Sequence, residues 1–193
     1  RLLRPFIERR AARLWADEES RLRVARRMYA YRFGEVLPHR DIAALRGIEG
    51  ARLREAYLLV AQKYGVPWKG RKYDRDNPEA ADLPNQAINH AATFVEAAAD
   101  IAVAAVGALP PLGFIHEDSS NAFTLDIADL WRVQTVLPLA FSVAAKVAKD
   151  PSLSLEREIR YEAARIFRRQ KLIPAMIERI KELLDVDDGR GNP

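Results

Sequence analysis

The sequence predicts an all-α fold of six to eight helices, and three observations support this class. Apolar residues recur at intervals of three and four along most of the 193 residues. No stretch alternates apolar and polar residues in the manner of a half-buried strand. Hydrophobic residues make up 49% of the chain, which is enough to form a core rather than a disordered polymer. We expect one α-helical domain over 1–186 and a polar tail over 187–193.

The expected helices are separated by loops rich in glycine, proline and polar residues. The two N-terminal helices are amphipathic and rich in arginine, and Gly34 ends the second. Thr124 is expected to cap the helix that follows it, and Asn85 or a neighbour to cap the alanine-rich helix. The predicted ranges are 2–14, 22–34, 41–64, 85–107, 125–148 with Pro138 inside it, and one or two helices from 155 onward.

Composition excludes several classes of protein. The absence of cysteine excludes a disulfide scaffold, a thiol nucleophile and a zinc site built on thiolates. The longest uncharged apolar run, Ile101–Ile115, is shorter than the roughly 20 residues of a membrane span and contains glycine and proline. No signal-peptide pattern stands at the start of the chain. We therefore expect a soluble intracellular protein that does not bind membranes.

Charge is distributed unevenly along the chain. Residues 1–40 carry 11 basic and 5 acidic side chains, whereas residues 85–150 carry 3 and 7. Basic arms around an acidic middle are typical of proteins that bind nucleic acid with a metal, because cations neutralise phosphates and carboxylates hold the metal. An ordinary solvated surface with chance asymmetry is the commoner explanation of such a distribution.

Two glycines flank a single carboxylate inside the predicted helix 41–64. Gly47 and Gly50 stand on either side of Glu49, and each glycine costs about 1 kcal/mol relative to alanine in a helix interior. We therefore expect another group to approach the backbone closely there. That group is either a metal or phosphate beside Glu49 or a crossing helix, and a crossing helix is the commoner case.

A histidine and two aspartates form a second candidate site. Asp126 and Asp129 are three residues apart, so they share one face of the expected helix. His116 precedes them in a loop that contains Gly113 and can fold back onto the helix start. Imidazole and carboxylates without a thiol suit Mn²⁺ or Mg²⁺. Aspartates near a helix N-terminus also stabilise the helix alone, so spacing leaves both interpretations open.

A basic stripe is expected on the helix that begins at Leu155. Its members fall within an arc of about 80° on an unbroken helix: Arg157, Arg160, Arg168 and Lys171. The glutamates of this segment lie off the stripe, so we do not expect a simple ladder of intrahelical salt bridges. The stripe is either a solvated face, which is the commoner case, or a surface that contacts the DNA backbone.

Seven sequence blocks together resemble the C-terminal catalytic domain of the CRISPR-associated spacer-integration nuclease, the integrase subunit of CRISPR adaptation. The resemblance is greatest to the subtype I-E branch, and the blocks follow the family's order over nearly the whole chain. They are RRMYAYRFGE (26–35), LRGIEGARLREAYLLVAQKYGV (45–66), WKGRKYD (68–74), NQAINHAA (85–92), GFIHEDSS (113–120), LDIADLWR (125–132) and EREIRYEAARIF (156–167). The family's N-terminal β-rich domain, which mediates dimerisation, is expected to be absent from this chain.

The resemblance also implies roles for individual residues. Glu49, His116 and Asp129 match the family's ligands of Mn²⁺ or Mg²⁺, and Asp126 matches the accompanying catalytic acid. Positions that match basic residues near the catalytic centre or the DNA are Arg132, Arg157 and Arg160, and the stripe adds Arg168 and Lys171.

The activity implied by the resemblance is metal-dependent phosphoryl transfer on DNA. Attack by a DNA 3′-hydroxyl would transfer new spacers into a CRISPR array, and attack by water would nick branched DNA. The implied partners are spacer-precursor and leader–repeat DNA, a second copy of the chain and a small non-catalytic adaptation subunit, in the prokaryotic cytoplasm. The alternative is a non-catalytic helical module that binds nucleic acid through its arginines. A hydrolase of small phosphate esters is a third possibility, but it would leave the long basic surfaces unused.

Overall fold

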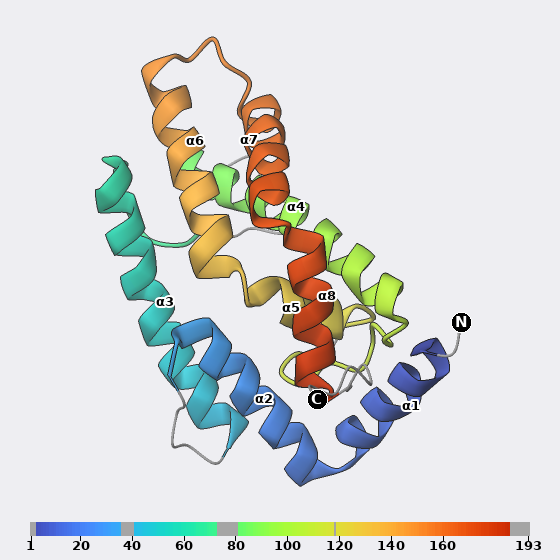
Figure 1. Ribbon diagram of the computed structural model, residues 1–193. Coiled ribbons are helices and arrows are strands. Elements are labelled where there is room, and N and C mark those ends of the chain that lie inside the picture. Colours follow the sequence, from blue (N-terminus) through green and yellow to red (C-terminus); the bar gives the residue numbers. More distant parts are fainter. Residues whose placement is uncertain (1–2, 36–40, 73–80, 118, 186–193) are drawn as a thin grey trace, which may run out of the picture. The chain divides into compact units, whose positions relative to one another are not determined.

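The computed structural model describes residues 3–35, 41–72, 81–117 and 119–185. Over these residues the chain contains eight α-helices, one π-helical turn and no strand, which confirms the predicted all-α class (Figure 1). The elements are α1 (Leu3–Ala16), α2 (Glu18–Phe33), α3 (Ile42–Tyr64), α4 (Leu83–Val106), α5 (Ala122–Asp129), η2 (Arg132–Val136), α6 (Leu137–Lys149), α7 (Leu155–Gln170) and α8 (Leu172–Leu183). None of the described helices is long and apolar enough to cross a membrane. The expected tail over 187–193 lies outside the described residues.

The chain divides into two compact units, each assembled from separate stretches of the sequence. The first unit comprises Arg1–Arg46, Glu96–Leu130 and Lys171–Pro193. The second comprises Gly47–Val95 and Trp131–Gln170. Apolar residues spaced for helices are buried in both units, as the periodicity of the sequence predicts.

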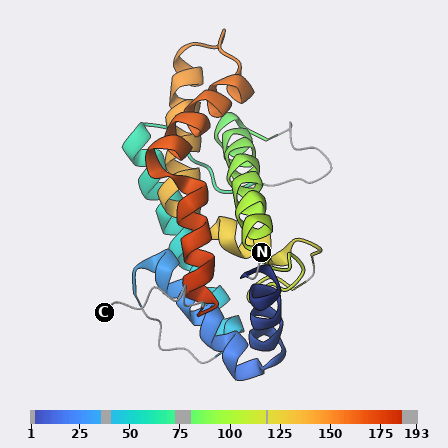
Figure 2. The ribbon, with the colours of Figure 1, turned by 45° about the vertical axis from the view of Figure 1, so that its right-hand side comes forward.

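In the first unit, α2 packs against α1 and against α8 (Figure 2). The N-cap of α2 is Asp17, whose carboxylate accepts a hydrogen bond from the Ser20 amide at 2.9 Å. Hydrogen bonds from the Ser20 side chain and then from its backbone hold the pKa of Asp17 below its ordinary value. Gly34 ends the helix with a φ of 75°, in the left-handed region that glycine adopts without strain.

Two arginines bind the C-terminal end of α8 in this unit. Nε of Arg10 donates a hydrogen bond to the carbonyl of Leu184 at 3.1 Å. The guanidinium of Arg27 donates to the carbonyl of Glu182 and to the carboxylate of Asp185, both at 2.5 Å. Burial lowers the pKa of Arg27, but hydrogen bonding and charge attraction to Asp185 outweigh it, so the pKa lies above its ordinary value. These contacts satisfy helix-terminal carbonyls that have no partner within the helix.

In the second unit, α6 packs against α7 and against η2 (Figure 1). The ring of Trp68 stacks on Tyr57 with centroids 5.1 Å apart, and it meets Phe141 of α6 edge-on at 5.3 Å. This aromatic cluster ties the segment after α3 to α6, because stacked and edge-to-face rings add to the burial of their apolar surface.

Two helices begin earlier than the sequence predicts. The helix α4 begins at Leu83, and the amide of Asn85 in its first turn donates a hydrogen bond to the carboxylate of Asp82 at 3.2 Å. The side-chain oxygen of Asn85 accepts instead from the amide of Lys72, which precedes the helix, at 2.9 Å. Likewise α5 begins at Ala122, so Thr124 is a buried residue of its first turn rather than a cap. The caps predicted at Asn85 and Thr124 are wrong because each helix already begins two residues earlier, at the apolar residues Leu83 and Ala122.

The helix predicted over 125–148 is interrupted. α5 ends at Asp129, the backbone then forms the π-helical turn η2, and α6 begins at Leu137. Pro138 therefore lies in the first turn of α6, where the missing amide hydrogen is not needed. The apolar pattern continues across the interruption, which is why periodicity alone does not detect it.

Candidate metal centre around His116

The loop 113–117 of the first unit is wound around the side chain of Asp126. Asp126 lies on α5, and its side chain is 0% exposed. One carboxylate oxygen, Oδ2, accepts hydrogen bonds from the amides of Phe114 at 2.6 Å and Ile115 at 3.0 Å. The other oxygen, Oδ1, accepts from the amide of His116 at 3.0 Å. Three consecutive amides thus converge on one buried carboxylate, and this fixes the loop conformation.

Gly113 allows the loop to pass close to the start of α5. A Cβ atom built on Gly113 would lie 2.2 Å from the carbonyl oxygen of His116 and 2.7 Å from Cβ of Ala122. The indole nitrogen of Trp15 donates a hydrogen bond to the Gly113 carbonyl at 3.0 Å. Only glycine fits this position, because the atoms that would clash belong to the backbone and to a short, rigid side chain.

The imidazole of His116 is oriented by the same carboxylate. Its Nδ1 lies 2.7 Å from Oδ1 of Asp126. Because an ionised carboxylate only accepts hydrogen bonds, this contact places the proton of the neutral ring on Nδ1 and a lone pair on Nε2. Nε2 lies 4.0 Å from Oδ2 of Asp129, and the imidazole is 39% exposed. The predicted return of His116 onto the helix that carries both aspartates is therefore found, and the ring resembles the carboxylate-oriented histidines of metal sites.

Asp129 has a buried partner that the sequence analysis did not identify. Nη2 of Arg32, on α2, lies 3.2 Å from Oδ2 of Asp129, and the Arg32 side chain is 3% exposed. A signal for Arg32 exists in the sequence, since it follows the buried Met28 and Tyr29 by one turn on the apolar face of α2. A charge at a core position requires a partner, because an isolated buried charge is very unfavourable.

The chemistry of the donors fits Mn²⁺ or Mg²⁺. Both oxygens of Asp126 are occupied by the loop and by His116, so this residue orients the imidazole. Nε2 of His116 and the carboxylate of Asp129, which is paired with Arg32, are the candidate ligands that lie beside this loop. Among the described residues, no group of three or more acidic or histidine side chains is arranged to hold a metal ion. Glu49 is half-buried on α3 in the second unit, and its convergence with His116 and Asp129 stays a prediction.

The glycines beside Glu49 have open surroundings. A Cβ built on Gly47 meets no described atom within 4 Å, and one on Gly50 lies 3.7 Å from Nη1 of Arg54. A crossing helix that requires small residues is therefore not observed at this point of the described structure.

The helix α7 carries three members of the predicted basic stripe. Arg157, Arg160 and Arg168 are exposed, and Ile159 is buried on the other side of the helix. Nη2 of Arg160 lies 3.4 Å from Oε1 of Glu156. Arg160 therefore has an intrahelical partner, although one such pair does not make the stripe a ladder of salt bridges. Exposed pairs of this kind contribute little, so Arg160 stays accessible to a stronger anion.

The remaining basic candidates lie elsewhere. Lys171 was expected on the same helix, but α7 ends at Gln170 and Lys171 is the N-cap of α8 with a left-handed backbone, φ 48°. Its predicted place on the stripe is wrong because the helix is not continuous. Arg132 is half-buried at the start of η2 in the second unit.

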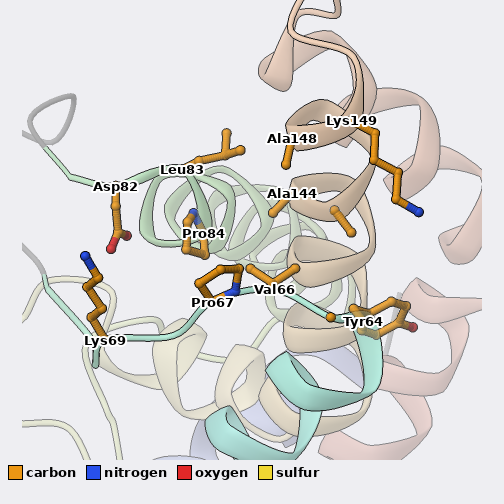
Figure 3. A pocket seen from close by; sticks show the side chains of 12 residues that line it. Tyr64, Val66, Pro67, Lys69, Asp82, Leu83, Pro84, Ala144, Ala148 and Lys149 are labelled. Atoms are coloured by element: carbon orange, nitrogen blue, oxygen red, sulfur yellow. The ribbon is translucent and has the colours of Figure 1, made fainter.

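The second unit contains a separate cavity of about 390 Å³ (Figure 3). It lies between the segment after α3, the start of α4 and the side of α6. Its lining is mainly apolar and includes one carboxylate, from Asp82, and no histidine: Tyr64, Gly65, Val66, Pro67, Lys69, Asp82, Leu83, Pro84, Ala144, Ala145, Ala148 and Lys149. This cavity therefore does not provide a metal centre.

Fold and site together define an all-α domain with a buried carboxylate that orients a histidine toward a second carboxylate. A family model described as "CRISPR associated protein Cas1" matches residues 6–158, most of the chain. The chain belongs to the Cas1 family, of which it represents the C-terminal helical region.

Curated relatives share this region at high identity. The CRISPR-associated endonuclease Cas1 of Geobacter sulfurreducens is 41% identical over 174 residues, covering 90% of this chain and 56% of the relative. The Cas1 endonuclease of Escherichia coli is 40% identical over 174 residues, with the same coverage. The chain thus spans about half the length of the curated relatives it matches.

Solved structures share the fold. A crystal structure described as a TtCas1–DNA complex has a TM-score of 0.83 and 36% identity, covering 96% of this chain and 66% of that chain. A casposase bound to an integration product has a TM-score of 0.74 at 13% identity, which is a likeness of fold alone.

Proposed function

We propose that this chain is the catalytic domain of a metal-dependent DNA endonuclease and integrase of the subtype I-E branch. Its reactions are the transfer of DNA 3′-hydroxyl ends into a CRISPR array and the nicking of branched DNA. The observation that supports this most strongly is the His116 ring, which Asp126 holds with Nε2 toward Asp129. Membership of the Cas1 family and the likeness to a DNA-bound relative support the substrate class.

In this proposal Glu49, His116 and Asp129 would hold Mn²⁺ or Mg²⁺. A bound cation would supply positive charge to the scissile phosphate and help to activate a 3′-hydroxyl or water. Asp126 acts as a positioning residue, because its carboxylate keeps the proton on Nδ1 of His116 and turns Nε2 toward Asp129. Arg32 restrains the Asp129 carboxylate through their buried ion pair. No side-chain nucleophile is required, which agrees with a chain that lacks cysteine.

The basic side chains bind the DNA backbone in this proposal. Arg157, Arg160 and Arg168 would contact phosphates along α7, and Arg132 and Lys171 would contribute from outside that helix. For the whole protein, we propose the partners expected from the resemblance: leader–repeat and spacer-precursor DNA, a second Cas1 copy and the small non-catalytic subunit.

The test combines metal binding with DNA cleavage in three proteins: the chain itself, His116→Ala and His90→Ala. His90 is a partly exposed histidine of α4 in the second unit, so it controls for loss of an imidazole elsewhere. Mn²⁺ binding is measured by calorimetry, and nicking and strand transfer are measured on a branched DNA. We expect His116→Ala to bind Mn²⁺ at least about tenfold more weakly and to lose cleavage, whereas His90→Ala keeps both.

Helical content measured by circular dichroism must be equal in the three proteins. Equal Mn²⁺ affinity in the chain and in His116→Ala would refute the metal site. DNA binding without metal binding would favour the alternative of a non-catalytic nucleic-acid-binding module.

A further inference from the structure

An exposed tyrosine lies beside the basic stripe on α7. Tyr161 is 60% exposed, although tyrosine is a large and partly apolar residue. It lies about 200° around the helix from the buried Ile159, so it faces away from the core of its unit. Arg157 and Arg168 lie within about 40° of it on the same face.

The ring of Tyr161 is already in contact with one of these arginines. The guanidinium carbon of Arg157 lies 5.5 Å from the ring centroid, and Nη2 of Arg157 lies 3.5 Å from the tyrosine hydroxyl. The two side chains thus form one composite surface, in which a cation stands beside a π-system. Such pairs of arginine and aromatic residues are the components of single-stranded nucleic-acid sites, where bases stack and phosphates are neutralised.

Tyr161 also lines a hollow of about 360 Å³ between α6 and α7. The charged groups of this hollow are balanced, since Lys146 binds Glu158 at 2.6 Å and Arg165 binds Glu162 at 2.5 Å. The hollow is therefore close to neutral, whereas the outer face of α7 carries arginines. An uncharged, planar ring of a ligand is compatible with the neutral hollow. Negatively charged phosphates are attracted to the arginines on the outer face of α7.

We propose that Tyr161 is a stacking platform for one unpaired nucleobase of a DNA strand whose phosphates follow the arginines of α7. This inference rests on the proposed DNA-processing function and adds a site for an unpaired nucleotide to it. Branched DNA and single-stranded ends supply such nucleotides, whereas blunt duplex does not. The platform therefore favours substrates with unpaired bases near the duplex, independently of base identity, because every base has a π-face.

A second exposed tyrosine provides the control. Tyr31, on α2 in the first unit, is 39% exposed, and the guanidinium carbon of Arg179 lies 3.6 Å from its ring centroid. Its ring already has a close cationic partner and stands outside α7. Replacement of Tyr31 should therefore leave binding of unpaired bases unchanged.

The experiment measures the binding of a single-stranded DNA and of a blunt duplex, each containing 2-aminopurine, over a range of salt concentrations. The proteins are the chain itself, Tyr161→Ala, Tyr161→Phe, Tyr31→Ala and Arg157→Ala. We expect Tyr161→Ala to bind the single strand about tenfold more weakly and to lose the quenching of 2-aminopurine, with the salt slope unchanged. Tyr161→Phe and Tyr31→Ala should bind as the parent chain does, and Arg157→Ala should lower the salt slope by about one unit.

Two results would overturn the stacking site alone. They are unchanged quenching in Tyr161→Ala and an equal loss of affinity for single strand and duplex. If the parent chain shows no salt-dependent binding of either DNA, the proposed function fails as well. Because Tyr161 is exposed, Tyr161→Ala should unfold at the same urea concentration as the parent, and this is measured on the same samples.

Discussion

Replacement of Asp126 by asparagine tests whether one buried carboxylate organises the loop 113–117. The carboxylate accepts three amide hydrogen bonds and one from the His116 ring, two at each oxygen. An asparagine keeps one oxygen and replaces the other with an amide NH₂ group, which only donates. In either orientation of the side chain, two of the four donors would therefore face another donor. Each hydrogen bond to a charged group contributes about 1.5–3 kcal/mol, so we expect Asp126→Asn to lower the free energy of unfolding by about 3–6 kcal/mol.

That loss is a large share of the roughly 5–15 kcal/mol that stabilises a domain, so it is easily measured. The assay is urea unfolding followed by far-ultraviolet circular dichroism, with Mn²⁺ calorimetry on the fraction that stays folded. Asp100→Asn is the matched control, because Asp100 is exposed and accepts one long hydrogen bond, from Thr124 at 3.4 Å. A loss below about 1 kcal/mol for Asp126→Asn would refute the argument, since it would mean that the loop does not depend on these four contacts.

Three further predictions follow from the described contacts. Gly113→Ala should destabilise the fold by about 1–3 kcal/mol through overpacking, whereas Gly47→Ala, with open space around it, should stabilise α3 by about 0.5–1 kcal/mol. The urea concentrations at the midpoints of unfolding compare the two variants. Equal effects would contradict the predicted clash of an alanine Cβ at position 113. Arg32→Gln leaves the partly buried carboxylate of Asp129 without this cation and should cost about 3 kcal/mol in unfolding free energy, while a change under about 1 kcal/mol would show that the pair is solvated. The hydrogen bonds of Ser20 hold the pKa of Asp17 below its ordinary value of 3.8, so the stability they add is present above that pH and is lost as pH falls through the lower folded-state pKa. Asp17→Ala should therefore unfold at lower temperature than the parent at pH 7 and at the same temperature in strong acid, and a gap that persists in acid would contradict the assignment.

Much of the fold could be predicted from the sequence because helices are local. Each helix is encoded by the spacing of its own apolar residues and by nearby signals such as Gly34, which ends α2 as predicted. The errors arise where a local pattern of residues continues through a point at which the backbone leaves the α-helical conformation. The apolar spacing runs through the break between α5 and α6, and the basic spacing runs through the end of α7 at Gln170.

The candidate site was predictable only where its residues are close in sequence or match a family motif. His116 and Asp126 are ten residues apart, so the return of the loop could be anticipated. The pairing of Arg32 with Asp129 joins distant segments of the chain, and no spacing rule reveals it. The requirement for glycine at 113 depends on the position of Ala122, which is set by the tertiary structure and not by the local sequence.

The arginine contacts at the end of α8 have a consequence for the order of events during synthesis. The hydrogen bond from Arg10 to Leu184 joins residues 174 positions apart, and that from Arg27 to Glu182 joins residues 155 apart. The unit that contains His116 and Asp129 is therefore held together by contacts between residues 10–27 and residues 182–185. While a ribosome still holds the C-terminal segment, α1 and α2 lack the helix against which they close, and contacts of such long sequence separation form late. The pair formed by His116 and Asp129 is therefore synthesised well before α8 is available to close the unit around it.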